Sequence, residues 1–251
     1  GEIGPRVPFY AAALVTFLNL IYGYFILPES LLKENRREFE WSRANPLGAL
    51  FALKRYPSVA GLIGALTFIY LASHAIQGTW TYFSMEKFNW SESMVGYSLG
   101  LVGIMSALVQ GLLIRIIIPK IGEYNTMITG IIFNICGCLL FSMASEGWML
   151  LCFIIPYSLG GIAGPAIQGI LSNQIPDNEQ GQLQGALTSM MAATGIIGPL
   201  MMTSIFAYFT AENAPIYFPG APFVTGAVLV SICLFLILRK GSMNTTGKNP
   251  I

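Results

Sequence analysis

Charged residues are scarce in this chain of 251 residues, and their scarcity excludes whole classes of protein. Asp, Glu, Lys and Arg make up only 10% of the sequence, against about 25% in an average globular protein. The net charge is +1, which provides no strong positive field to attract a nucleic acid. The composition therefore argues against an ordinary water-soluble domain and against a nucleic-acid partner.

Seven stretches of the chain contain no charged residue at all. Each has at least 22 residues, and a helix needs roughly 20 apolar residues to cross a bilayer. A buried helix of a soluble protein would not recur seven times at this length. The sequence therefore predicts an all-α polytopic membrane protein with seven transmembrane helices in the lipid bilayer. They are expected near residues 9–27, 58–83, 94–118, 125–144, 148–172, 182–209 and 222–238.

The groups that enzymes and metal sites use are also missing. The cysteines, Cys136, Cys138, Cys152 and Cys233, all lie in apolar stretches, where a disulfide framework is not expected. No Asp or Glu lies deep in any predicted span, and His74 is the one histidine. We find no hydrolytic triad, metal cluster or phosphate loop, and we predict no enzyme activity, no metal and no cofactor.

Small residues recur at helical spacing in two of the predicted spans. One stripe is formed by Gly96, Gly100, Gly103, Ala107 and Gly111, and the other by Gly181, Gly185, Ser189 and Ala193. Small residues on one face let another helix approach closely inside a membrane. Both spans are therefore predicted to pack tightly against neighbouring helices.

Positive residues gather on one side of the predicted membrane. One side holds eleven Lys and Arg residues, and the other side holds two. The first side consists of loops 31–57, 115–124 and 173–181 and the tail after residue 238. The positive-inside rule places the first side in the cytoplasm, so the amino end is outside and the carboxyl end is cytoplasmic. We divide the chain into a helix at 1–30, a loop at 31–57 with a short amphipathic helix near 32–41, a six-helix unit at 58–240 and a tail at 241–251.

Polar residues inside the predicted spans are the candidates for a substrate site, because a polar group in hydrocarbon usually lines a cavity or meets another helix. His74 is either a neutral imidazole hydrogen-bonded to a neighbouring helix, or a proton relay or substrate ligand. Gln110 is either a cavity residue or a link between helices, and Asn134 is expected to pack. The predicted cavity residues are His74, Gln77, Trp80, Ser106, Gln110 and Gln168.

Several motifs resemble the carboxyl-terminal part of a major facilitator superfamily transporter, in particular the bacterial tetracycline-resistance efflux pumps. The strongest are GPAIQGILS at 164–172 and QGQLQGALTSMMAATGIIGPL at 180–200. Three further segments resemble sequences of these pumps, namely PFYAAAL at 8–14, FILPES at 25–30 and FNWSESMVGY at 88–97. A fourth, GLLIRIIIPKIGE at 111–123, resembles the second copy of the superfamily's cytoplasmic gating motif.

The resemblance implies that the chain, which begins at Gly1, corresponds to helices six to twelve of twelve and lacks its amino-terminal half. Residues 58–144 and 148–238 would be two inverted three-helix repeats. Arg115, Lys120, Gly122 and Glu123 would form the cytoplasmic gate, through ion pairs between helices. Such pumps carry a histidine four residues before a glutamine on the eighth helix, where this chain has Ser106 before Gln110. The resemblance therefore leaves open whether tetracycline is the substrate.

The function that follows is export of a drug-like or metabolite small molecule across the bacterial inner membrane. The expected mechanism is alternating access driven by a proton gradient, with the acids that couple protons in the missing half. Two alternatives stay open from the sequence. One is an uptake carrier of the same fold, and the other is a membrane receptor or enzyme without transport activity.

Overall fold

The computed structural model describes residues 6–27 and 56–245. Helix α1 (Val7–Ile26) belongs to one unit, and the helices from α3 onward form another. The first is a continuous apolar helix, as the charge-free stretch predicts, and Pro28 follows its carboxyl end in the sequence. The predicted amphipathic helix near 32–41 lies outside the described residues.

The described residues contain helices and connecting turns but no β-strand, which confirms the all-α prediction for that part of the chain. Two short irregular helices, η4 and η5, interrupt the long ones. The elements after α1 are α3 (Pro57–Phe88), α4 (Glu92–Leu108), the π-helical turn η4 (Val109–Leu113), α5 (Ile114–Met143), α6 (Gly147–Leu159), the 3-10 turn η5 (Gly160–Ile162), α7 (Ala163–Ser172), the 3-10 turn η6 (Asp177–Glu179), α8 (Gln180–Thr210) and α9 (Ala221–Thr245).

Local sequence explains the turn between α3 and α4. Asn89 ends α3 in the left-handed conformation, at φ 51° and ψ 38°, a region that asparagine tolerates better than most residues. Ser91 then caps α4, where its side chain accepts a hydrogen bond from the amide of Met94 at 3.3 Å. Glu92 lies in the first turn, where a negative charge interacts favourably with the helix dipole.

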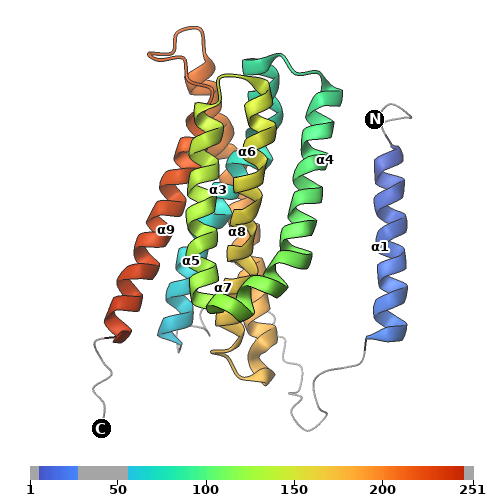
Figure 1. The fold of residues 1–251 in the computed structure, drawn as a ribbon, viewed down its shortest axis with the longest axis vertical. Coiled ribbons are helices and arrows are strands. Elements are labelled where there is room, and N and C mark those ends of the chain that lie inside the picture. Colours follow the sequence, from blue (N-terminus) through green and yellow to red (C-terminus); the bar gives the residue numbers. More distant parts are fainter. Residues whose placement is uncertain (1–5, 28–55, 246–251) are drawn as a thin grey trace. The chain divides into compact units, whose positions relative to one another are not determined.

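The predicted count of seven spans is not confirmed by helix length and composition, which give six candidate stretches. One of the six, Glu92–Met143, has 52 residues, far more than a single crossing needs. The backbone leaves the helical conformation inside it at Gly122, with φ 79° and ψ 163°. Figure 1 shows that the chain turns at the foot of α4, so α4 and most of α5 run in opposite directions.

The helices from α3 onward pack around two apolar clusters. Helix α3 lies against α8 and α9, and α5 lies against α6, α7 and α9. One cluster is largely aliphatic and includes Leu66, Ile131 and Val230, and the other is built on the aromatic side chains of Trp80 and Phe83. The division into two inverted repeats stays a prediction.

Glycines bring α5 into backbone contact with α6 and α7. A Cβ atom at Gly130 would lie 2.6 Å from the amide nitrogen of Ala163, and one at Gly137 would lie 2.7 Å from the Cα of Tyr157. Both distances are shorter than any relaxed packing contact, so only glycine fits at these two positions.

The predicted glycine stripes on α4 and α8 behave differently. A Cβ at Gly96, Gly100, Gly103 or Gly111 would meet no atom of the described chain within 4 Å, and the same holds for Gly181. These glycines therefore make no close helix contact within the described residues. Helix α8 packs against α3 at other positions, among them Gly198.

Candidate functional site

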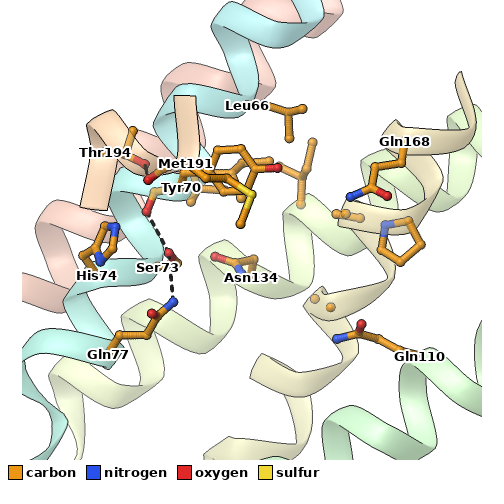
Figure 2. Close-up of a pocket in the computed structure, with 18 residues that line it drawn as sticks. Leu66, Tyr70, Ser73, His74, Gln77, Gln110, Asn134, Gln168, Met191 and Thr194 are labelled. Carbon is orange, nitrogen blue, oxygen red and sulfur yellow. Dashed lines mark hydrogen bonds between the residues drawn. The ribbon is translucent and has the colours of Figure 1, made fainter. Parts of the chain in front are cut away.

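A cavity of about 660 Å³ lies among the helices of the second unit. Its wall is formed by α3, η4, α5, η5, α7, α8 and α9. Figure 2 shows polar side chains from these elements directed into one space, with Tyr70, His74 and Gln77 on one side and Gln110 and Gln168 on the other. A cavity of this size matches the range for small-molecule sites.

Helix α3 contributes one continuous stripe to the wall. The stripe consists of residues that lie three or four positions apart along α3 and therefore share a helix face, namely Tyr70, Ser73, His74 and Gln77. The Nε2 of Gln77 donates a hydrogen bond to the Oγ of Ser73 at 3.3 Å, and that hydroxyl donates to the carbonyl of Tyr70 at 2.7 Å. This chain of hydrogen bonds fixes the carboxamide of Gln77 at the cavity edge (Figure 2).

The opposite wall presents two glutamines from irregular parts of their helices. Gln110 lies in the π-helical turn η4, and π-turns are often found at functional sites. Gln168 follows Gly164 and Pro165 on α7. Both side chains are exposed, and neither forms a hydrogen bond with another described residue. Their donors and acceptors are therefore free to bind a ligand.

The cavity wall is polar but uncharged. None of the described residues that line it is Asp, Glu, Lys or Arg, and its titratable side chains are those of Tyr70 and His74. The imidazole of His74 has no hydrogen-bond partner among the described residues and packs against Gly198 of α8. Of the two interpretations of His74, the one with a hydrogen bond to a neighbouring helix finds no such bond in the described part of the chain.

Four of the six predicted cavity residues, His74, Gln77, Gln110 and Gln168, line this one space. Ser106 and Trp80 lie outside the wall. Ser106 lies on α4, four residues before Gln110, and does not border the cavity, whereas Gln110 lies in the π-helical turn η4, which does.

Trp80 points away from the cavity into the aromatic cluster. Its side chain is 2% exposed, its Nε1 donates to the Oγ of Ser98 at 2.9 Å, and its ring packs edge-on against Phe141 and Phe223. Trp80 lies three residues past Gln77, at the edge of the polar stripe. The rotation around the axis of α3 between these two positions is enough to direct the ring of Trp80 toward α4, α5 and α9.

The structure adds residues to the wall that were not predicted as cavity residues, namely Tyr70, Ser73, Asn134, Met191 and Thr194. Tyr70 belongs to the polar stripe of α3, so the spacing could have identified it. Asn134 is an isolated polar residue on α5, expected to pack, and only the fold shows that it faces the cavity floor between the two polar walls (Figure 2).

The predicted gate residues lie around the break in α5. Gly122 supplies the backbone turn, with a positive φ that glycine adopts without strain. Glu123 forms no ion pair with Arg115 or Lys120 in the described chain, and both of these basic residues are exposed. Its carboxylate accepts hydrogen bonds from the Nδ2 of Asn173, at 3.3 and 3.5 Å, and packs against Gly169. The gating motif therefore contacts the carboxyl end of α7 through a hydrogen bond between a carboxylate and an amide, and not through an ion pair.

Comparison with known proteins agrees with this architecture. The Major Facilitator Superfamily profile matches residues 1–199 and, in a second overlapping match, residues 83–250. The chain belongs to the Major Facilitator Superfamily. The crystal structure of the human organic anion transporter MFSD10 has the same fold, with a TM-score of 0.75 at 23% identity, over 92% of this chain and 57% of that one.

Within the superfamily, the chain is similar to bacterial tetracycline resistance proteins. The class C protein of Escherichia coli is 34% identical over 242 residues, which is 96% of this chain and 59% of the relative. The class H protein of Pasteurella multocida is 30% identical over 238 residues, or 93% of this chain and 57% of the relative. The chain therefore spans somewhat more than half the length of these relatives. The resemblance stated from the motifs is confirmed.

Proposed function

We propose that this chain forms one wall of a secondary transporter that exports a drug-like or metabolite small molecule by alternating access. The observation that carries the proposal is the cavity of about 660 Å³, which borders apolar helices long enough to cross a membrane and is lined by two glutamines, Gln110 and Gln168, without hydrogen-bond partners in the described chain. Hydrocarbon gives no hydrogen bonds, so free carboxamides at membrane depth are costly unless water or a substrate occupies the space. A carrier has such a space, and a membrane enzyme would need acids or a nucleophile there.

The substrate would be recognised mainly by shape and hydrogen bonds. Gln110 and Gln168 each offer an amide donor and a carbonyl acceptor. Leu66 and Ile69 of α3 and Ile131 of α5 add apolar surface to the lining of the same cavity. This combination favours an amphipathic ligand, and the relatives named as tetracycline resistance proteins make tetracycline the first compound to test.

Proton coupling is the second part of the proposal. His74 is the single side chain of the described wall whose unperturbed pKa lies near neutral pH. The wall holds no carboxylate, so further proton carriers would lie on the part of the fold that this chain does not span. Energy would come from the proton gradient and not from a bound cofactor.

Removing the amide of Gln168 should weaken export without weakening the fold. Gln168→Ala removes an exposed group that has no partner in the described chain, so stability should change by less than about 0.5 kcal/mol. Loss of one substrate hydrogen bond, worth about 0.5–1.5 kcal/mol, should reduce export by roughly two- to tenfold. Drug accumulation in cells that express the complete carrier measures export, and melting in detergent measures stability.

Gln184→Ala is the matched control, because Gln184 is also an exposed glutamine but lies on α8 outside the cavity wall. It should leave both export and melting unchanged. Equal export by all three proteins, or a loss of melting temperature with Gln168→Ala, would contradict the assignment of Gln168 to substrate binding.

Topology gives an independent prediction. The asymmetry of Lys and Arg places the loop that contains Arg37 in the cytoplasm and Lys87 on the outside. Single cysteines at positions 37 and 87, introduced after the four native cysteines are replaced, can be labelled with an impermeant thiol reagent in intact cells. Position 87 should react and position 37 should be protected. The reverse pattern would mean that the fold is inserted the other way round.

A further inference from the structure

Helices α3 and α8 are in close contact beside the cavity, where the side chain of His74 lies against Gly198. A Cβ atom at Gly198 would overlap the Cδ2 of His74, and its next neighbours would be the Cγ of the same ring at 2.6 Å and the Cβ of His74 at 3.0 Å. One turn further along α3, a Cβ at Gly78 would lie 3.7 Å from the Cα of Pro199, the residue that follows Gly198. The space that Gly198 leaves empty is thus occupied by the imidazole.

This contact falls where α8 is easiest to bend. Pro199 lies inside α8 and has no N–H, so the helix bond from residue 199 to the carbonyl of Gly195 is missing. Helices that bend sharply most often do so at proline. The Oγ1 of Thr203 donates to the carbonyl of Pro199 at 2.7 Å and to that of Leu200 at 3.3 Å, which supports the helix on the far side of the break. A change in the bend of α8 at Pro199 would therefore directly alter the contact between the adjacent Gly198 and the ring of His74.

The surroundings of His74 contain little else that titrates. Helix α3 contributes Tyr70 to the same wall, whereas η4, α5 and α7 contribute Gln110, Asn134 and Gln168. Helix α8 contributes Met191 and Thr194, and α9 contributes Val230. No charged residue of the described chain faces the imidazole from these elements, so its ionisation depends mainly on solvent and on the packing of α8.

We propose that Gly198 is the positioning residue for His74: the missing side chain lets the imidazole lie against the bendable turn of α8, so that the ring's protonation and the packing of α3 on α8 are linked. The positioning holds whether or not the protein transports. The link to export rests on the proposed function, and the experiments below separate the two.

The first experiment observes the imidazole directly. His74 is the only histidine in the 251 residues, so ¹⁵N-histidine labelling gives one set of ring signals if purification uses a tag without histidine. The chain in nanodiscs is titrated from acid to alkaline pH as wild type, Gly198→Ala and Gly195→Ala. Gly195→Ala is the matched control, because it adds the same methyl group one turn away where nothing lies within 4 Å.

Gly198→Ala should displace the ring signals and move the titration midpoint by about half a pH unit or more, and Gly195→Ala should reproduce the wild type. Unchanged signals in Gly198→Ala would overturn the proposal. Equal changes in both variants would also overturn it, because the effect would then belong to α8 as a whole and not to position 198.

A second measurement keeps the proposal testable if Gly198→Ala folds poorly. In the double variant His74→Ala, Gly198→Ala the ring atoms that the added Cβ would overlap are absent, and the Cβ of residue 74, 3.0 Å away, must move by only a few tenths of an ångström. If Gly198 acts through His74, this double variant should melt at the temperature of His74→Ala alone. If the melting temperature of the double variant falls by the sum of the two single decreases, Gly198 acts through a contact other than His74, and the proposal would fail.

Export by the complete carrier then tests the link. Gly198→Ala should shift the pH dependence of drug export relative to Gly195→Ala. If the imidazole signals move while export keeps the wild-type pH profile, the positioning stands and the link to transport is refuted. If the unmutated carrier exports nothing, the proposed function fails, while the titration result is unaffected.

Discussion

Trp80→Ala is expected to destabilise the protein strongly while leaving the cavity wall chemically intact. The indole is 2% exposed and packs against Phe141, Phe223 and Trp90. Its removal leaves a large void between α3, α5 and α9, and truncation of a buried aromatic residue to alanine costs about 3–5 kcal/mol in soluble proteins. We expect a value near 3 kcal/mol, because part of that range reflects transfer from water, which is weaker inside a bilayer.

Thermal unfolding in detergent measures this effect, and two variants serve as references. Trp148→Ala removes an indole that is 62% exposed, so it should change stability little. Trp80→Phe keeps most of the ring packing and loses the hydrogen bond to Ser98, which is worth about 1 kcal/mol. If Trp80→Ala instead kept the wild-type melting temperature and altered export, Trp80 would be a substrate residue, as the sequence alone had predicted.

The second large effect is expected at the glycines of α5. A methyl group at Gly130 would overlap the backbone of Ala163, and one at Gly137 would overlap the backbone of Tyr157. Backbone atoms cannot rotate out of the way, so α5 must separate from α6 and α7. Overpacking of this kind costs typically 1–3 kcal/mol per site, and the separation would also change the shape of the cavity that α5 and α7 enclose.

Melting temperatures of Gly130→Ala and Gly137→Ala should therefore fall clearly below that of Gly103→Ala. Gly103 lies on α4, and a Cβ there would meet nothing within 4 Å, so this variant carries the same change in helix propensity without the clash. Alanine favours a helix over glycine by about 1 kcal/mol, so Gly103→Ala should be neutral or slightly stabilising. A similar gain at Gly130 would mean that the close contact with α7 does not exist in the membrane.

The helices themselves could be predicted with good accuracy, because the exclusion of charge from hydrocarbon acts on each segment separately. The predicted spans near 58–83 and 182–209 correspond to α3 and α8, whose ends differ from the prediction by a few residues. The number of spans is not confirmed, because helix length and composition join residues 92–143 into one stretch of 52 residues. The sequence separates this stretch into two spans at the charged residues between 115 and 123, and the backbone leaves the helical conformation in the same region, at Gly122.

The candidate site could be predicted only where it follows one helix. His74 and Gln77 share a face because of their spacing, and that face does line the cavity. Ser106 and Gln110 were both predicted as cavity residues, but only Gln110, in the π-helical turn η4, lines the cavity. The gate shows a similar limit. The motif around Gly122 marks the turn, but the partner of Glu123 is Asn173, fifty residues further along the chain.

The sequence by itself determined the class of protein, the positions of its helices and the superfamily. Each of these depends on the solubility of one segment in hydrocarbon or on a contiguous motif. Only the tertiary structure decided which face of each helix borders the cavity, which glycines carry a backbone contact, and that Trp80 belongs to the core while Asn134 faces the cavity. The physical reason is that lipid and protein interiors are both apolar, so burial against another helix leaves little trace in hydropathy. The small rotation that separates a cavity residue from a core residue is fixed by how neighbouring helices pack.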